Sequence, residues 1–414
     1  MNVQELIAEL TLSPKKFTAI GFGTVCVALI HPSNFDAVLL LQGEKKKVAR
    51  EPSASHPSSL PTGENILEDH KKTVGVSEII DPILERGLSA DFVHASLLDS
   101  AVIDSPQTIK LDAETEWRFV AARLTKRIPG ISLDRLCTEG VNTLGTERAE
   151  TVTSGIAEWI FQLHHKVGAQ MSALIDPTAF RKIAGKQTSS FKSTTSYRYF
   201  GKKNPQNLRE LKDQLAQTDS TSDERLRNIS SNLATTDINI ADICELADLL
   251  KERVDAILAQ DRISMTLTHG DLHIGNFLVD PQSLRVHGVC DWMKAMLDHP
   301  GMDFIRLTSC PGLMPKVFEK YQEKEAGHKT ETPVNKEFVY AFSTLYAFHW
   351  LIKEAEKSNG CFQQFHTSIV EQVEELARMN PAIYGQAEQK FSKNTSARAL
   401  MTEYNRPQAA SAAL

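Results

Sequence analysis

The sequence predicts an α+β protein in two parts, a small N-terminal antiparallel sheet with about one helix and a larger, mainly helical C-terminal part. Two observations support this. Apolar, β-branched and aromatic runs bounded by turn residues dominate the first 125 residues, whereas apolar residues recur at helical spacing from about residue 126 onward. A chain of 414 residues is long enough to bury a large core in two or more domains.

The N-terminal part, residues 1–125, contains three runs that we expect to form strands, at residues 17–31, 37–42 and 117–124. Between the second and third runs, the Pro- and Ser-rich stretch REPSASHPSSLPTG predicts a loop. ENILEDHKKTVG follows it as a short polar helix.

The C-terminal part, residues 126–395, begins with ETVTSGIAEWIFQLHHKVG, in which apolar residues fall on one helical face. They predict a core helix and are Val152, Ile156, Trp159, Ile160, Leu163 and Val167. Further helices are expected at residues 241–258, 336–357 and 369–379. The polar residues 186–236 predict a lid or a mobile insertion, and residues 396–414 a frayed tail.

Charge and cysteine content exclude several classes of protein. The 46 Lys and Arg residues against 52 Asp and Glu give a formal net charge of -6, so no nucleic-acid or membrane partner is expected. Six scattered cysteines favour free thiols in a reducing compartment. The first residues do not resemble a signal peptide, and no run approaches 18 apolar residues, so we expect a cytoplasmic location.

The stretch THGDLHIGNFLVD, residues 268–280, carries the chemistry. Two apolar runs, NFLV and RVHGVC, are joined by DPQS and predict a hairpin that would bring Asn276 beside Asp291. Amide and carboxylate oxygens are ligands of the kind that Mg²⁺ prefers. Asp271, on the preceding loop, can accept the proton of a hydroxyl group that attacks phosphorus. The stretch therefore predicts phosphoryl transfer.

The pattern H-G-D-x-x-x-x-N, a hairpin, D-W and then D-x-P-x-x-D resembles the aminoglycoside phosphotransferase and choline kinase-like family of small-molecule kinases. The matching residues are His269, Gly270, Asp271, Asn276, Asp291, Trp292, Asp298, Pro300 and Asp303. The resemblance implies a protein-kinase-like fold of two lobes, the smaller binding nucleotide. It implies that Asp271 is the catalytic base, that Asn276 and Asp291 bind Mg²⁺, and that His269 and Asp303 support the loop.

In the N-terminal part the resemblance is looser. Gly21 and Gly23 are the candidates for a nucleotide-covering loop, although Cys26 stands where a third glycine would be expected. The resemblance implies that a basic residue near the end of the strand that includes residues 37–42 binds the phosphates of the nucleotide. Arg50 is the first candidate for that role and Lys47 the second, with Glu68 as the partner on the helix.

Several alternatives remain open. His269, Asp271, Asn276 and Asp291 could be ordinary turn residues that hydrogen-bond the backbone near a hairpin. Alternatively, His269, Asp271 and His273 could belong to a dinuclear hydrolase site, which would need further His and Asp clusters. His164 and His165 are interpreted as partners of a helix C-terminus. SYRYFGKKN, residues 196–204, predicts a substrate lid, a surface for an anionic partner or an exposed basic loop.

The sequence thus predicts a cytoplasmic phosphotransferase that moves the γ-phosphate of ATP, or of GTP, to a hydroxyl of a small molecule with Mg²⁺ as cofactor. The alternative is a catalytically weak or inactive kinase-like binding protein, suggested by Cys26, by the unassigned phosphate-binding cation and by Met293 after the D-W pair. A protein kinase is disfavoured because no D-F-G or A-P-E run is present. The sequence does not identify the acceptor.

Overall fold

The structure is a computed structural model, and it divides the chain into two compact units. Unit 1 comprises Met1–Pro129, Gln170–Lys186 and His287–Ala295, and unit 2 comprises Gly130–Ala169, Gln187–Val286 and Met296–Leu414. The structure describes residues 2–22, 26–31, 34–47, 63–110, 115–137, 140–168, 197–217, 223–236, 238–260, 265–328, 330, 332–357 and 362–392. The expected tail at 396–414 lies outside these ranges.

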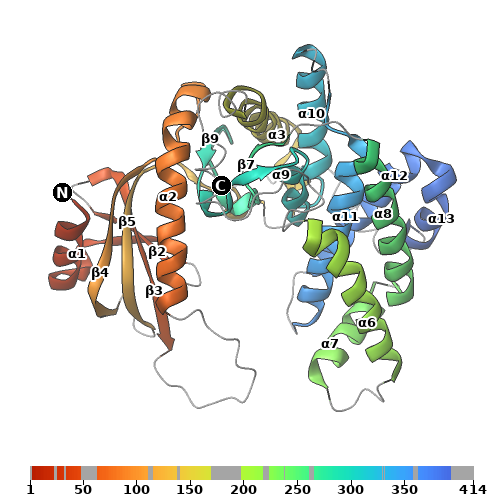
Figure 1. Ribbon diagram of the computed structural model, residues 1–414, viewed down its shortest axis with the longest axis horizontal. Coiled ribbons are helices and arrows are strands. Elements are labelled where there is room, and N and C mark those ends of the chain that lie inside the picture. The colour runs from red at the N-terminus through yellow and green to blue at the C-terminus, as the bar shows by residue number, and fades with distance from the viewer. Residues whose placement is uncertain are drawn as a thin grey trace, which may run out of the picture. The chain divides into compact units, whose positions relative to one another are not determined.

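Unit 1 is built on a five-stranded antiparallel sheet with the order β1-β2-β3-β5-β4 (Figure 1). The strands are β1 (Thr18–Phe22), β2 (Cys26–His31), β3 (Asn34–Lys47), β4 (Leu97–Lys110) and β5 (Thr115–Lys126). The run expected at residues 17–31 is therefore two strands, and β4 was not expected at all. Its sequence, LLDSAVIDSPQTIK, mixes polar and apolar residues and contains a proline, which hides the strand pattern.

Two helices lie on opposite sides of this sheet (Figure 1). α1 (Val3–Leu12) begins with a capping box formed by Asn2 and Glu5, and it buries an apolar face against the sheet core. α2 (Gly63–Gly87) packs against β3, β4 and β5. The sequence predicted only a short polar helix here. The observed helix is longer because its second half carries apolar residues at helical spacing, namely Val76, Ile80, Ile83 and Leu84, all buried.

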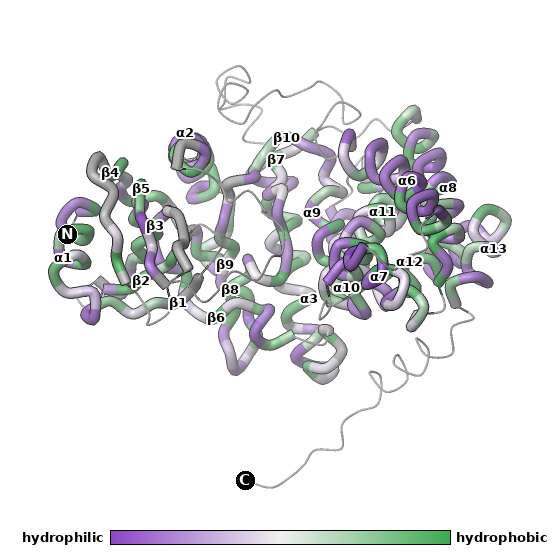
Figure 2. The backbone as a smooth tube through the Cα atoms, turned by 90° about the horizontal axis from the view of Figure 1, so that it is seen from below, coloured by the Kyte–Doolittle hydropathy of each residue, from purple (hydrophilic) through white to green (hydrophobic). Residues whose placement is uncertain are grey.

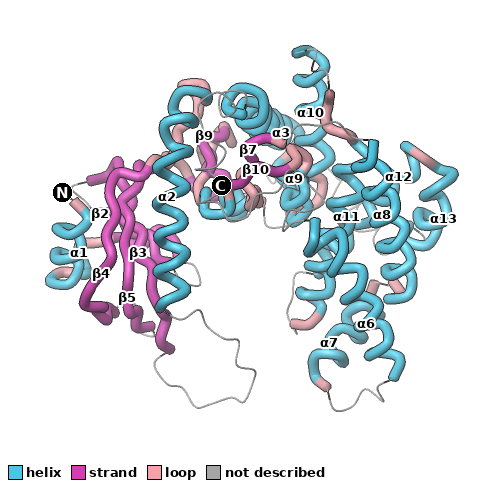
Figure 3. The backbone as a smooth tube through the Cα atoms, viewed as in Figure 1, coloured by secondary structure: helices cyan, strands magenta, loops and turns pink. Residues whose placement is uncertain are grey.

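Unit 2 is mainly helical (Figure 3). Its longer helices are α3 (Thr146–Phe161), α6 (Asn204–Gln217), α7 (Glu224–Ala234), α8 (Ile240–Gln260), α10 (Leu313–His328), α11 (Lys336–Ala355), α12 (Phe362–Met379) and α13 (Pro381–Ser392). The expected helices at 241–258, 336–357 and 369–379 are confirmed as α8, α11 and part of α12. Together with the sheet of unit 1, they confirm the expected protein-kinase-like α+β fold class.

The centre of unit 2 is α11, which packs against α8 and α12 (Figure 2). Its residues from Phe338 to Phe348 are all buried. The predicted core helix is α3, and it continues into a π-helical segment, Gln162–Val167. A second π-helical segment, Tyr197–Lys203, leads into α6, so the stretch interpreted as a lid or basic loop is helical. Tyr197 within it is buried and donates a hydrogen bond to Asp255.

Short strands place the loops of unit 2. β6 (Ile131–Ser132) pairs with β8 (Phe277–Val279), and β7 (Thr266–Thr268) pairs with β10 (Met296–Asp298). The predicted turn after β8 is present, since the Asp280 N–H donates to the Arg285 carbonyl at 2.9 Å, and β9 (Val286–Val289) begins directly afterwards. None of the described helices is long and apolar enough to cross a membrane.

Candidate active site

The loop after β7 carries His269, Gly270 and Asp271, and backbone geometry fixes how it leaves the strand. β7 pairs with β10 in antiparallel register, Thr268 opposite Met296. The chain then turns at Gly270, whose φ of 74° is in the left-handed region that glycine adopts without strain. The pairing with β10 also brings the segment that follows β10, which includes Asp303, close to this turn.

Asp303 binds the loop directly. Its carboxylate accepts hydrogen bonds from the backbone N–H of His269, at 3.0 Å to Oδ1 and 3.2 Å to Oδ2, and from Gly270, at 3.2 Å. Asp303 is fully buried, in the short helix α9 (Met302–Ile305). A buried carboxylate needs such donors, and here the loop that carries Asp271 supplies them. The structure therefore places Asp303 where a loop-supporting residue would act.

A third donor to Asp303 comes from the π-helical segment after α3. His164 Nε2 lies 3.0 Å from the Asp303 carboxylate, which can only accept, so Nε2–H is the donor, and His164 Nδ1 lies 3.0 Å from the Tyr321 hydroxyl. His165 Nε2 lies 3.2 Å from the same hydroxyl. Burial, with Glu325 and Asp303 nearby, raises the pKa of Tyr321, which keeps the phenol protonated as a donor. The interpretation of His164 as a helix-end partner is thus wrong, because its buried side chain joins the network behind the loop.

His269 is also fully buried, and it contacts both the loop backbone and the core. Its Nδ1 accepts from the Asp271 N–H at 3.3 Å, and its ring lies edge-on to Trp159 at 6.3 Å. The Trp159 ring contacts Phe277 in the same way. His269 therefore connects the backbone of the loop to the apolar core of α3.

Asp271 is only 7% exposed, and its carboxylate forms an ion pair with Arg306. Arg306 begins the 3₁₀ segment Arg306–Ser309, and its guanidinium lies 5.7 Å from the centre of the Tyr346 ring on α11. Burial raises the pKa of Tyr346 to about 12, an effect that Arg306 opposes and Asp271 reinforces. The sequence did not indicate Arg306, because DFIRLTSC reads as an ordinary apolar helix.

Asn276 lies at the end of the turn formed by residues 274–276 and is 6% exposed. Its Nδ2 donates to the carbonyl of Asp271 at 2.8 Å, which couples it to the candidate base five residues earlier. Because the amide nitrogen is used in this bond, the amide oxygen is the atom that can turn toward a cation. The position therefore fits a ligand of Mg²⁺, which prefers oxygen donors.

Asp291 lies in unit 1, just after β9. Its backbone is left-handed, with φ 66° and ψ 62°, a rare conformation for a residue with a side chain, and its side chain is exposed. The segment around it is held within unit 1. The Val93 N–H donates to the His287 carbonyl at 2.6 Å, and the Trp292 ring lies edge-on to His94. An exposed carboxylate on such a fixed backbone is also suited to bind a cation that prefers oxygen ligands.

The nucleotide-binding candidates of the N-terminal part are only partly described. Gly21 lies in β1, Lys47 is the last residue of β3, where its backbone pairs with Thr115, and Glu68 is exposed on α2. Gly23 and Arg50 lie outside the described residues. Their roles stay predictions.

The hydrolase alternative requires a cluster of metal-binding side chains. Within the described residues, no group of three or more His, Cys, Asp or Glu side chains is placed to hold a metal ion. His273 instead accepts a hydrogen bond from the Gly275 N–H at 3.0 Å through its Nδ1, as expected for a loop residue.

Comparisons with known proteins bear on the family. No curated protein matches the sequence. Among solved structures, the GDP complex of wild-type aminoglycoside 2'-phosphotransferase-IIIa is 15% identical, with a TM-score of 0.48 and coverage of 95% of this chain and 99% of that one. Spectinomycin phosphotransferase in complex with ADP and spectinomycin is 13% identical, with a TM-score of 0.46 and coverage of 97% and 98%. With TM-scores below 0.5, neither likeness bears on what this chain binds.

The family model of the phosphotransferase enzyme family matches residues 92–327, more than half of the chain. The match includes Asp271, Asn276, Asp291, Asp303 and Arg306. The chain belongs to the phosphotransferase enzyme family.

Proposed function

We propose that this phosphotransferase moves the γ-phosphate of ATP, with GTP as a possible second donor, to a hydroxyl group of a small molecule, and that it requires Mg²⁺. The observation that carries the proposal is the loop of residues 269–276. Within the family match, Asp271 is held in a buried network that includes Asp303, Asn276 and Arg306.

In the proposed reaction, the oxygen of the acceptor hydroxyl attacks the γ-phosphorus, and the Asp271 carboxylate accepts the proton of that hydroxyl. The bond from the γ-phosphorus to the bridging oxygen of the β-phosphate breaks, and the nucleoside diphosphate leaves with that electron pair. Positioning dominates such reactions, so the fixed loop matters more than the strength of the base. Arg306 restricts the orientation of the Asp271 carboxylate.

Bound Mg²⁺ would neutralise charge on the phosphates, with Asn276 and Asp291 as its proposed protein ligands. Lys47 or Arg50 would bind the phosphates, with Glu68 as partner, and Gly21 and Gly23 would lie in the loop that covers them. These assignments remain proposals. So do the cytoplasmic location and the division into a nucleotide-binding part at 1–125 and an acceptor-binding part at 126–395.

Calorimetric titration of Mg-ATP tests the nucleotide site. We expect binding to the natural protein that depends on Mg²⁺ and that weakens in Asp291→Ala. Asp271→Asn should bind Mg-ATP with nearly unchanged affinity, but release of ADP in the presence of acceptors should fall by at least about a hundredfold. Absence of binding to the folded natural protein, with Mg-GTP also tried, would contradict the proposal and favour a kinase-like protein without phosphotransfer.

The role of Arg306 is tested in the same assay. Arg306→Lys retains the charge but not the planar fork, so we expect it to lower kcat while leaving the affinity for Mg-ATP unchanged. Arg378→Lys on α12, at an exposed arginine paired with Glu375, is the matched control for this exchange of cations. Equal kcat values for Arg306→Lys and the natural protein would show that Arg306 does not orient Asp271.

A further inference from the structure

Two cysteine thiols meet in the interior of unit 2, and we call Cys137 and Cys310 the thiol pair. Cys137 is 2% exposed and Cys310 is 1% exposed, both are free thiols, and a hydrogen bond joins their side chains. The backbone joins the same two segments, because the Val141 N–H donates to the Pro311 carbonyl at 3.2 Å. Nothing in the proposed reaction uses this pair.

The two thiols differ in acidity. The hydrogen bond donated by Cys310 lowers the pKa of the Cys137 thiol, an effect that burial opposes and Arg148 reinforces. The same bond raises the pKa of Cys310 well above its usual value, and burial adds to this effect. Cys137 is therefore the sulfur that ionises first, and Cys310 is the proton donor beside it. A thiolate with a second thiol in contact is the arrangement that redox-active cysteines use.

Two other uses of a cysteine pair fit this arrangement less well. A structural zinc ion takes four ligands, and in the part of the chain that the structure describes no group of three or more His, Cys, Asp or Glu side chains could hold a metal ion. Buried cysteines also serve as small apolar side chains. Cys244 on α8 fits that role, since it is buried and its burial raises its pKa. Packing alone does not account for two thiols that share a proton.

Hydrogen peroxide is the oxidant that suits the pair, because it is little larger than water and both thiols are buried. The Cys137 thiolate attacks one peroxide oxygen, the O–O bond breaks, and the departing hydroxide takes the proton that Cys137 lost and leaves as water. The Cys310 sulfur then attacks the sulfenic acid formed at Cys137. The S–O bond breaks, and the hydroxide leaves with the Cys310 proton as a second water. Two electrons pass from the sulfurs to the peroxide, and one disulfide results.

Cys310 directly follows the 3₁₀ segment Arg306–Ser309, which carries the partner of Asp271. The Cys310 N–H donates to the Leu307 carbonyl at 3.1 Å, so the segment is a tight turn without slack. A displacement of Cys310 therefore reaches Arg306 four residues earlier.

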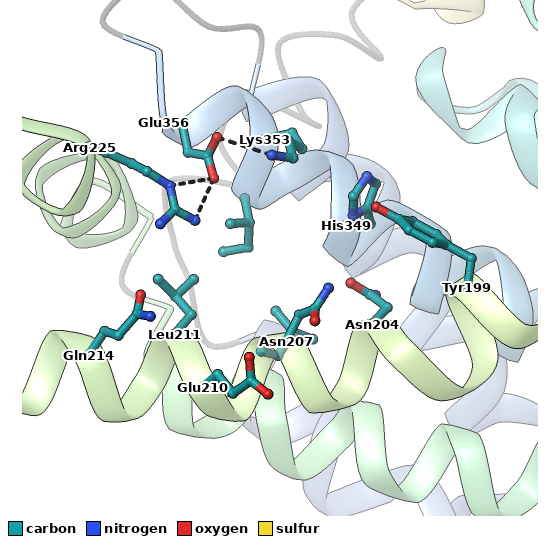
Figure 4. Close-up of a pocket in the computed structure, with 12 residues that line it drawn as sticks. Tyr199, Asn204, Asn207, Glu210, Leu211, Gln214, Arg225, His349, Lys353 and Glu356 are labelled. Carbon is teal, nitrogen blue, oxygen red and sulfur yellow. Dashed lines mark hydrogen bonds and ion pairs between the residues drawn. The ribbon is translucent and has the colours of Figure 1, made fainter. Parts of the chain in front are cut away.

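The ring that Arg306 contacts is fixed independently. Tyr346 belongs to α11, which is buried along its centre and ends at one wall of a cavity of about 220 Å³ (Figure 4). In that wall, Glu356 pairs with Arg225 of α7 at 2.8 Å (Figure 4). Because α11 is held in this way, a displaced Arg306 moves away from the Tyr346 ring instead of carrying it along.

Cys137 is joined to the loop that carries the Mg²⁺ candidate Asn276. The Cys137 N–H donates to the Leu133 carbonyl at 3.0 Å, and the hydroxyl of Ser132, one residue earlier, donates to the Gly275 carbonyl at 2.7 Å. A disulfide holds its sulfurs at about 2.0 Å, shorter than a hydrogen-bonded contact, so its formation draws the two segments together. The thiol pair thus connects two parts of the candidate site.

We propose that Cys137 and Cys310 are a modification site at which hydrogen peroxide forms a disulfide, and that this bond switches the phosphotransferase off by displacing Arg306 from Asp271. The formation of the bond does not depend on the proposed function, whereas the loss of turnover rests on it. Disulfides in reducing compartments are usually transient and regulatory, which agrees with the expected location.

The test treats the natural protein with hydrogen peroxide and maps its peptides by mass spectrometry without reduction. We expect a linked peptide that contains Cys137 and Cys310 and that dithiothreitol separates. Hydrogen exchange of the peptide that contains residues 304–310 should accelerate on oxidation, and this readout does not depend on turnover. Release of ADP from Mg-ATP, with water as acceptor, should fall at least about tenfold, since small misplacements of catalytic groups have large effects.

Cys310→Ala and Cys137→Ala cannot form the bond, so each should keep the exchange rates and turnover of its own untreated sample. Cys244→Ala is the matched control for a buried cysteine and should respond to peroxide like the natural protein. Absence of the linked peptide, unchanged exchange in its presence, or equal loss of turnover in Cys310→Ala would overturn the proposal. If the reduced protein neither binds Mg-ATP nor releases ADP, the phosphotransferase proposal fails, and a linked peptide still establishes the modification site.

Discussion

Replacement of Asp303 by alanine offers the sharpest test of the network behind the loop. Asp303 accepts from three donors, the N–H groups of His269 and Gly270 and the imidazole of His164. A hydrogen bond to a charged group contributes about 1.5 to 3 kcal/mol. Water entering the space left by the carboxylate would satisfy part of the loss. We therefore expect Asp303→Ala to lower the free energy of unfolding by about 4 kcal/mol, within the range for broken buried pairs.

Asp303→Asn should cost about half as much. Its amide oxygen can still accept from the two backbone groups, and its nitrogen can donate to His164 if the imidazole changes tautomer, although the charge is lost. Asp280→Asn is the control, since Asp280 also accepts from two backbone N–H groups, those of Gln282 and Ser283, but in a turn that water can reach. We expect that change to cost less than about 1 kcal/mol.

Two measurements apply to these variants. Urea unfolding gives the overall stability, and hydrogen exchange of the peptide that contains residues 268–271 reports the loop itself, even if the two units unfold separately. In Asp303→Ala, the hydrogen-exchange rates of the His269 and Gly270 amides should increase more than those of the rest of unit 2. Unchanged exchange in this peptide, with an unchanged urea midpoint, would refute the assignment of Asp303 as the support of the loop.

Two further predictions concern stability. Burial raises the pKa of Glu371 from 4.5 to about 7, so its protonated form is favoured in the folded state. The stability that this group contributes is complete below pH 4.5 and is lost as the pH rises through 7, by up to about 3 kcal/mol. Glu371→Gln, which can still accept from the Gly312 N–H, should reduce the change in the urea midpoint between pH 4.5 and 7.5. A change as large as in the natural protein would contradict this. Gly288→Ala should destabilise unit 1, because a Cβ there would lie 2.1 Å from the Val93 carbonyl oxygen, and a thermal midpoint equal to that of the natural protein would show that the backbone accommodates it.

Local patterns predicted the elements that depend on local sequence. The helical spacing of Val152, Ile156 and Trp159 predicted α3, and all three are buried as expected. The turn at residues 280–283 was predicted from its composition alone. β4 and the second half of α2 were missed, since one has a mixed pattern and the other follows a polar beginning and contains Pro82.

The partners of the candidate base could not be predicted in the same way. Asp271 and Arg306 are 35 residues apart, and His164 lies more than a hundred residues from Asp303. A local sequence pattern does not indicate which buried charged side chains form pairs. The pairing depends on how α9 and the π-helical segment pack against the loop. Only the resemblance indicated Asp303, and it gave no sign of His164 or Arg306.

The course of the chain has a consequence for its synthesis. Unit 1 includes His287–Ala295, which follows most of unit 2 in sequence and is held to Val93 and His94 by a backbone bond and a ring contact. Domains usually fold in order as they leave the ribosome, the N-terminal one first. Here the first unit cannot be completed until residue 295 of 414 has emerged. A fragment ending at Pro129 would therefore expose the surface that this late segment covers, and nascent chains of intermediate length would be the ones most in need of a chaperone.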